Sequence, residues 1–562
     1  MKTLKYFFIV LMLTAMVMAQ YFQPTKFLLE KSLSDSTETI NELKSNSISE
    51  IKLQGDSTVW LGTGQGLAMM QDSVSILAND ILLLSDGTNK IVNDGISAIG
   101  VLGDNLIVAA ATSDGETPIG SGLYFTENSL ESSIVWVYHD QPQEDTEEDS
   151  LEVPFGGRYF TMLPVTTAHA NVSYDAAISD NYIWITSWAG GLRRVEIDSA
   201  SIPNQPWTNV PLPDDNDAFL MTCDDTSYVT NADGMEVLKD YYLNPRDPLD
   251  GGNHNHKAFA VLAYDDIVWV GTANGINRGV VDLTSAGCIN WEHYSFPQDG
   301  ISGNFVVGFA RQVWMDYNII WAVTINAEDT EEERGLSYTI NDGLSWRTTL
   351  RGERIYNVTS KNNLVFAASE NGLWKAIIDN PNDEPIWALF QPAKQVSPIE
   401  DSTLFDVKEI LTNEVISVAF DDREDGRSVL WLGTLDGLAR SSDLHGSNWT
   451  IFQAEYDPTE VYAYPNPFSP YSHNVLNGDG YVRFHTSEVV SYTIEMSIYN
   501  FALGNVLRKT YDRRSGTESL KWDGKDQNGK LVDNGVYFIN LKFVEKQNFS
   551  PEDHWLKLIV VK

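Results

Sequence analysis

Short apolar segments, in which hydrophobic and polar positions alternate, recur along most of the chain and are separated by tight turns. The clearest pattern is an apolar segment with a tryptophan, then Gly-Thr, two or three further residues, and Gly-Leu or Gly-Ile. Alternation with a period of two is typical of a half-buried β-strand. The Asn-Gly, Asp-Gly and Gln-Gly pairs supply the positive φ angles of a hairpin turn. Each copy therefore predicts a β-hairpin.

Eight copies of this hairpin pattern can be found along the chain. The three clearest are residues 60–67, 269–276 and 431–438, and the weaker or interrupted ones are residues 108–123, 184–192, 228–235, 321–336 and 366–373. The tryptophans of the pattern are Trp60, Trp184, Trp269, Trp321 and Trp431. An apolar segment precedes each copy and a fourth follows several, which predicts four-stranded blades stacked around an axis as a β-propeller. We expect eight blades, with seven as the alternative because the copies at Gly122 and Gly234 are degenerate.

The pattern changes at about residue 456, where a proline-rich opening leads into a second unit. Short alternating segments and turn-rich loops fill the remaining residues up to 562, and this organisation suits an Ig-like β-sandwich. The sequence thus predicts an all-β protein, with a single β-propeller over residues 20–455 and an Ig-like β-sandwich over residues 456–562.

The N-terminus predicts export. Lys2 and Lys5 precede an apolar run over residues 6–18, and Val17 and Ala19 offer small side chains for cleavage after Ala19. We therefore expect a signal peptide over residues 1–19. The run is too short to span a bilayer comfortably and no second run of spanning length follows. The expected location is secreted, either extracellular or on the cell surface, by way of the periplasm.

Charge and cysteine content narrow the function classes. The formal net charge of −40 argues against nucleic acid and anionic membranes as partners, since both require clustered Lys and Arg.

Cys223 and Cys288 are the two cysteines. The repeat register predicts Cys223 on an inner strand and Cys288 on an outer strand of the next repeat. Export permits a bond between them, but we expect two buried thiols instead.

The hairpin copies resemble the two-component-regulator propeller repeat of secreted and periplasmic bacterial proteins. The segment from Thr339 to Trp346 also resembles the Asp-box of sialidase-type and sortilin-type propellers. That resemblance implies that Asn341, with Gly343 after it, braces the turn between a third and a fourth strand. It also implies that Trp346 packs between blades. Both resemblances imply a fold and no active site.

The C-terminal unit resembles the sorting domain of type IX secretion substrates and the Ig-like domain of flagellar-hook-capping proteins. The shared marks are Tyr464-Pro-Asn-Pro-Phe468, Ile498-Tyr499-Asn500 with Gly504, Trp522-Asp-Gly, Gly535-Val-Tyr-Phe and the terminal Lys557-Leu-Ile-Val-Val-Lys562. The resemblance implies export through residues 456–562 and the secretion machinery as a partner. The insert over residues 547–554 departs from the family pattern.

Candidate binding residues fall on one predicted face of the propeller, where loops enter inner strands and where second strands turn into third strands. His169 precedes one inner strand and His254 and His256 precede another, while Trp188 lies in a turn. A His-x-His pair in an extended segment points both rings the same way and can hold a metal. An exposed tryptophan can stack on a sugar. The alternative is a polar loop and a tryptophan packed between blades.

The sequence also offers oxygen ligands of the kind that calcium prefers. Asp523, Asp526 and Asn528 are spaced like part of a calcium site, although a turn explains them equally well. The acidic stretches 214–217 and 421–426 lack the spacing of a defined calcium loop. No other cofactor is expected.

We find no catalytic constellation in the sequence, which leaves three hypotheses. The first is a non-enzymatic binding or structural protein that recognises a glycan or a surface protein. The second is a secreted hydrolase or lyase acting on polysaccharide, which would need a polar axial pocket with two carboxylates about 5–10 Å apart. The third is an accessory component of the type IX secretion machinery.

Overall fold

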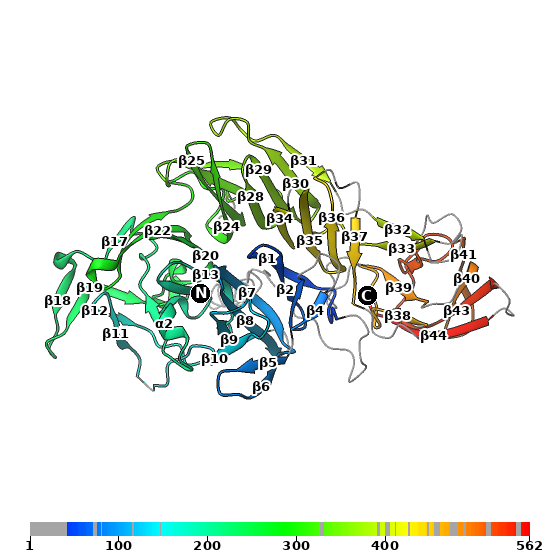
Figure 1. The fold of residues 1–562 in the computed structure, drawn as a ribbon, viewed down its shortest axis with the longest axis horizontal. Coiled ribbons are helices and arrows are strands. Elements are labelled where there is room, and N and C mark those ends of the chain that lie inside the picture. The colour runs from blue at the N-terminus through cyan, green and yellow to red at the C-terminus, as the bar shows by residue number, and fades with distance from the viewer. Residues whose placement is uncertain are drawn as a thin grey trace, which may run out of the picture. The chain divides into compact units, whose positions relative to one another are not determined.

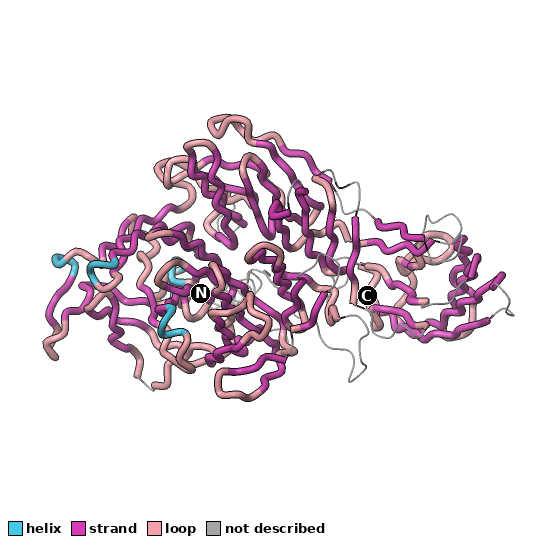
Figure 2. Tube along the Cα trace, in the orientation of Figure 1, coloured by secondary structure: helices cyan, strands magenta, loops and turns pink. Residues whose placement is uncertain are grey.

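The computed structural model describes residues 42–562 with short gaps. The gaps are residues 71–75, 80, 115–116, 147, 326–330, 391–393, 399–404, 411, 425–426, 445, 447–448, 455–460, 472–479, 487–490, 513–518 and 547–551. The signal peptide expected over residues 1–19 lies outside the described residues. Strands dominate the rest, and helices are confined to single turns (Figures 1 and 2).

The chain forms two compact units. In its described part, the first unit comprises residues 117–120 and 139–355. Three of its sheets have four consecutive strands in chain order. These sheets are β13(Ser173–Ile178), β14(Tyr182–Ser187), β15(Gly191–Glu196) and β16(Thr208–Val210); β20(Ala258–Tyr264), β21(Ile267–Thr272), β22(Gly275–Asp282) and β23(Cys288–Tyr294); and β24(Phe305–Trp314), β25(Tyr317–Ile325), β26(Gly335–Thr339) and β27(Arg347–Thr349).

The second unit comprises residues 42–114, 121–138 and 356–562, apart from the gaps given above. Four of its sheets contain the same four-strand order. These runs are β1(Ile48–Gln54), β2(Thr58–Thr63), β3(Leu67–Met70) and β4(Ile76–Ala78); β7(Gly95–Leu102), β8(Asn105–Asp114), β9(Thr117–Thr126) and β10(Val135–His139); β28(Ile355–Lys361), β29(Leu364–Ser369), β30(Gly372–Ile377) and β31(Trp387–Phe390); and β34(Ser417–Glu424), β35(Arg427–Thr434), β36(Gly437–Ser441) and β37(Trp449–Phe452). Beside β10 lie β5(Ile81–Leu84) and β6(Asn89–Ile91).

Such four-stranded sheets are the blades of the predicted propeller, and the all-β propeller fold is confirmed. The copy at Gly234 does not belong to such a sheet. It forms the turn between β18(Tyr228–Thr230) and β19(Glu236–Leu243), which join β11(Leu151–Phe155) and β12(Arg158–Met162) through a parallel pairing. The described residues therefore hold seven sheets of blade type, which favours the alternative count of seven over eight.

The threonine of the repeat stabilises its hairpin turn. The Thr63 hydroxyl donates to the carbonyl of Gly66 at 2.7 Å, and the Thr272 hydroxyl donates to that of Gly275 at 3.2 Å. The same hydroxyl accepts the backbone N–H two residues further on, at 3.0 to 3.1 Å. Gly275 has a φ of 106°, and a Cβ there would collide with the carbonyl oxygen of Tyr294, so only glycine fits.

The repeat tryptophans are buried, and in Trp60, Trp184, Trp269 and Trp321 a nearby side chain accepts the indole N–H. The indole of Trp60 donates to the Gln54 amide oxygen at 2.6 Å, and that of Trp321 donates to the Gln312 amide oxygen at 2.9 Å. In both cases the acceptor belongs to the preceding inner strand. The tryptophan thus closes the first hairpin of its sheet while filling the core.

Single side chains link the inner strands of successive sheets. The Asp175 carboxylate accepts the N–H of Val261 at 3.0 Å within the first unit. In the second unit the Glu50 carboxylate accepts the N–H of Ile99 at 3.0 Å, and the Ser417 hydroxyl donates to the carbonyl of Ile48 at 3.1 Å. This last bond joins the first and the last blade-type sheets of the chain, which pack side by side as propeller blades do.

The C-terminal module is a sandwich of two sheets around one core. One sheet orders β38(Tyr462–Tyr464), β39(Val482–His485) and β42(Lys521–Trp522), and the other orders β41(Asn505–Asp512), β40(Ser491–Asn500), β43(Gly535–Lys546) and β44(Glu552–Val560). The core between them includes Phe468, Trp522 and Tyr537. This arrangement confirms the predicted Ig-like β-sandwich. A separate hairpin, β32(Lys394–Pro398) with β33(Phe405–Glu409), precedes β34.

Replacing Thr272 by valine tests the role of the repeat threonine. We expect a loss of about 1–3 kcal/mol in the free energy of unfolding. The shape is kept, while the buried Asn255 oxygen loses the hydroxyl that donates to it, and the Gly275 carbonyl loses its longer share of the same hydrogen. Thermal or urea unfolding measures the change. Thr284→Val on an exposed turn is the matched control and should cost less than about 0.5 kcal/mol. Equal losses in both variants would contradict this role.

Candidate functional site

The structure places the four candidate residues near the positions expected for them. Trp188 lies in the turn between β14 and β15, and His254 and His256 belong to the single turn η3(His254–His256) directly before β20. His169 is exposed four residues before β13, and its backbone pairs with Ile119. Trp188 and His254 both contact Lys257, whereas His256 lies in a separate, buried environment.

His256 belongs to the scaffold of the first unit. Its ring is fully buried, its Nδ1 accepts the N–H of Asn244 at 2.9 Å, and its Nε2 donates to the carbonyl of Leu212 at 3.1 Å. The expected extended His-x-His geometry is wrong, because His254 and His256 lie in a 3₁₀ turn. The two rings therefore do not form the metal-binding pair that the sequence suggested.

A carboxylate from a distant loop shapes this turn. Asp215 accepts the N–H of His254 at 3.0 Å and that of Asn255 at 2.7 Å. The buried Asn255 side chain donates to the carbonyl of Pro213 at 2.8 Å and accepts from the Thr272 hydroxyl at 2.7 Å. The loop and the blade are thus joined by a network in which each buried polar group is engaged.

A cation lies beside Trp188 at the predicted binding face. Lys257 is only 4% exposed, its Nζ is 2.8 Å from His254 Nδ1, and it lies 4.9 Å from the centre of the Trp188 ring. The half-buried indole thus covers an ammonium group, an arrangement stabilised by cation–π attraction. Sequence reasoning missed Lys257. Its isolation as the one Lys or Arg between Arg246 and Arg278 was the available signal.

Next to Trp188, aromatic side chains from three inner strands pack together. Tyr174 of β13, Phe259 of β20 and Phe305 of β24 are all buried, and the rings of Phe259 and Phe305 stack at 4.5 Å. Tyr174 and Trp188 each lie 5.5 Å from Phe259. Burial raises the pKa of Tyr174, which keeps its phenol neutral. An apolar cluster therefore fills this part of the inner strands.

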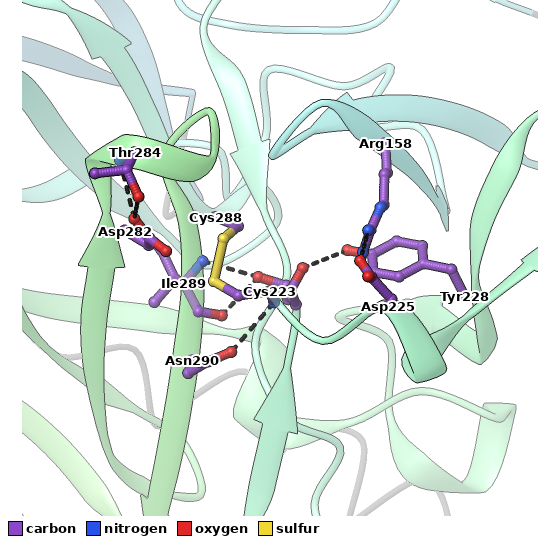
Figure 3. Close-up of a disulfide and its surroundings, with 10 residues drawn as sticks. Arg158, Cys223, Asp225, Tyr228, Asp282, Thr284, Cys288, Ile289 and Asn290 are labelled. Carbon is purple, nitrogen blue, oxygen red and sulfur yellow. Dashed lines mark hydrogen bonds and ion pairs between the residues drawn. A yellow bond between two sulfur atoms is a disulfide. The ribbon is translucent and has the colours of Figure 1, made fainter.

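The two cysteines form a disulfide, so the expectation of two buried thiols is wrong (Figure 3). Cys223 does not lie on an inner strand. It follows β17(Phe219–Met221), which adds a fifth strand to the sheet beside β23, and Cys288 is the first residue of β23. The Cα atoms are 5.3 Å apart, within the usual range for a disulfide. The outer position of Cys288 is confirmed.

One acidic group accompanies the disulfide. Among the described residues, Asp282 and the two cysteine sulfurs form the one group of His, Cys, Asp or Glu ligand atoms with metal-like spacing. Both sulfurs are consumed in the covalent bond, so this trio does not offer thiolate ligands. Nearby, the Arg158 guanidinium pairs with the Asp225 carboxylate and lies over the ring of Tyr228 (Figure 3). These contacts hold the hairpin of β18 and β19 to β12.

The calcium candidates in the C-terminal module act as turn residues. The Asp526 carboxylate accepts the N–H of Asn528 at 2.8 Å and that of Lys530 at 2.9 Å. These bonds, that from Lys530 first, lower the pKa of Asp526. Asp523 pairs with Lys525 at 2.8 Å. The contacts favour the turn over the partial calcium site.

The segment that resembles an Asp-box lies between β26 and β27. The Asn341 side chain accepts the N–H of Ser345 at 3.0 Å and thereby braces the turn around Gly343. Trp346 packs on Trp269 and Tyr294 of the neighbouring sheet, with ring centres 5.9 and 5.8 Å apart. Its position fits a tryptophan packed between blades.

Comparisons with known proteins report distant structural likenesses. No family model and no curated protein matches the chain. PorZ, a bacterial surface component of the type IX secretion system of Porphyromonas gingivalis, is 13% identical with a TM-score of 0.35; the match covers 92% of this chain and 66% of PorZ. The extracellular domain of the putative hybrid two-component system BT4673 from B. thetaiotaomicron is 12% identical with a TM-score of 0.24, covering 94% and 88%.

AztD from Citrobacter koseri, in its apo form, is 8% identical with a TM-score of 0.32, covering 73% of this chain and 89% of AztD. The chain spans just under two thirds of the length of PorZ. Within the part of the chain that the structure describes, no helix is long and apolar enough to cross a membrane.

Proposed function

We propose that this chain is an exported propeller protein that acts as a non-enzymatic binding or structural module at the cell surface or outside the cell. The observation that carries this proposal is the aromatic cluster of Tyr174, Phe259 and Phe305 on the inner strands. Hydrolysis of a polysaccharide requires a polar site with two carboxylates. The cluster offers apolar packing on these inner strands, and the Asp175 carboxylate beside it is already engaged by the backbone N–H of Val261.

The binding face that we propose is centred on Trp188, Lys257 and His254. A partly exposed indole supplies a stacking surface, and the positive charge of the buried ammonium group that it covers favours an anionic substituent on the ligand. A glycan with a carboxylate or phosphate group fits this chemistry. A surface protein that inserts an acidic side chain is the alternative partner. His169 belongs to the same predicted face, and we assign it no separate role.

Export through residues 456–562 is the second part of the proposal. The marks that carry the resemblance to type IX sorting domains lie far apart in the sequence, yet several of them meet in one core. Phe468 lies 5.9 Å from Trp522, and Trp522 lies 5.8 Å from Tyr537. This packing supports a module whose family-like motifs together form one core, and the secretion machinery is the partner that we propose for it.

Truncation after residue 455 tests the export function. The full chain and residues 1–455 should both enter the periplasm, because both retain the N-terminal segment. Only the full chain should then reach the cell surface or the medium. Quantitative immunoblotting of periplasmic, surface and medium fractions measures the difference. If the truncated chain reaches the surface or medium as well as the full chain does, residues 456–562 do not direct export.

A further inference from the structure

The opening motif of the C-terminal module holds the terminal strand. The Asn466 side-chain amide donates to the carbonyl of Lys557 at 2.8 Å, and its oxygen accepts the N–H of Ile559 at 3.0 Å. Both contacted groups belong to β44, which is the edge strand of its sheet. One side chain thus occupies a donor and an acceptor that an edge strand would otherwise offer to another chain.

Phe468 continues this contact along the same edge. Its N–H donates to the carbonyl of Ile559 at 2.8 Å, and its carbonyl accepts the N–H of Val561 at 2.9 Å. The pairing is a parallel bridge, anchored by the buried Phe468 ring in the core. The edge of the terminal strand is therefore closed from Lys557 to Val561.

Alternate side chains of the same strand face outward on the sheet and are exposed, while Leu558 and Val560 between them lie in the core. Trp555 is 59% exposed and Ile559 is 36% exposed, with exposed Lys557 between them. Tyr499 on β40 lies 5.7 Å from Trp555. Single exposed apolar residues are normal, but a group of them on one sheet face marks an interaction surface. Tryptophan and tyrosine are also enriched at the centres of protein interfaces.

Charge sets this module apart from the rest of the chain. Residues 456–562 carry 12 Lys and Arg against 13 Asp and Glu, whereas residues 1–455 carry 26 against 65. The negative net charge of residues 1–455 repels an acidic partner. Residues 456–562 are nearly neutral and do not repel it. On the outward face of the sheet, Lys557 stands opposite Phe538 in the strand pairing. Lys557 therefore offers an acidic partner a charge within the apolar group.

We propose that Asn466 and Phe468 form a clasp that closes the edge of β44, and that the export machinery recognises the folded module through the outward side chains Trp555, Lys557 and Ile559. The partner that fits is a protein surface with an apolar depression and a carboxylate. Strand addition over Lys557 to Val561 is disfavoured, because the clasp already occupies those backbone groups. This inference rests on the proposed export function.

Substitutions on the outward face test the recognition surface in the full chain. Trp555→Ser combined with Ile559→Ser, and separately Lys557→Glu, should lower the exported fraction about tenfold or more. Amide exchange of residues 552–562 should stay as in the unsubstituted chain, which shows that the module is folded. Leu344→Ser, at an 86% exposed leucine on a propeller turn, is the control and should be exported normally. Normal export of both face variants would overturn the proposal.

A second variant tests the clasp. Asn466→Ala should raise the exchange rate of the Ile559 amide about tenfold, since that N–H loses its acceptor. Asn466→Asp keeps the acceptor and loses the donor, so its exchange rate should lie between the two. Asn500→Ala removes a side chain that accepts the N–H of Gly504 in the same module and should leave Ile559 unchanged. Unchanged exchange in Asn466→Ala would show that there is no clasp.

The two proposals fail in different ways. If residues 1–455 are exported as well as the full chain, the export function itself is wrong. If that truncation blocks export while the Trp555 and Ile559 double variant and the Lys557 variant are exported normally, the export function stands. In that case only the recognition surface is wrong.

Discussion

Replacing Cys223 and Cys288 by serine is expected to lower the free energy of unfolding of the first unit by about 4 kcal/mol. The bond closes a loop with a sequence separation of 65 residues, so its loss restores much freedom to the unfolded chain. Directly before that loop, β17 is held to β23 by only three residue pairs. We therefore expect residues 219–243, which carry β17, β18 and β19, to unfold locally before the rest of the first unit.

Scanning calorimetry and amide exchange measure this effect. A reductant should lower the melting temperature of the unsubstituted chain and leave that of the double serine variant unchanged, which makes the variant its own control. Exchange should increase first over residues 219–243. A melting temperature that does not respond to the reductant would mean that the bond contributes nothing to the stability of the folded unit.

Replacing Asn255 by alanine is expected to cost about 3 kcal/mol of unfolding free energy. The buried side chain donates to Pro213 and Asn277 and accepts from Thr272, so its removal leaves several buried groups without a partner. The loss of this support should also displace η3 and, with it, His254 and Lys257. We expect the indole fluorescence of Trp188 to change, because its neighbouring cation moves.

Urea unfolding and fluorescence spectroscopy check this prediction. The matched control is Asn181→Ala at an exposed position before β14, which should change the stability by less than about 0.5 kcal/mol. Similar losses in the two variants would indicate that the Asn255 network does not hold the loop to the blade. The result would also weaken the proposed binding face, since that face depends on the position of η3.

The repeat pattern was sufficient to predict the hairpins, because local turn chemistry and alternation determine a hairpin. It could not tell which sheet a hairpin joins, since that depends on pairing between distant segments. The hairpin at Gly234 has the expected turn but pairs with β12 in an inserted sheet. Counting it as a blade placed Cys223 on an inner strand, and the disulfide was missed for that reason.

The candidate site, too, could be predicted only as far as it depends on local sequence. The face carrying Trp188, His254 and His256 followed from the order of strands within a blade. The backbone conformation of η3 could not be predicted from the strand order, because it is set by the Asp215 carboxylate from a loop about 40 residues away. The sequence around His254 contains no sign of that contact. Lys257 was overlooked because a lysine before a strand is ordinarily a solvated residue.

The side-chain links between inner strands have a consequence for how such a chain can change in evolution. Asp175, Glu50 and Ser417 each bond to a backbone group of the neighbouring sheet. Every residue except proline offers the same backbone groups, so the neighbour needs no matching side chain. A blade can therefore be duplicated, lost or replaced by a divergent copy without a compensating substitution at these bonds. Tolerance of this kind is consistent with repeats as unequal as those of this chain.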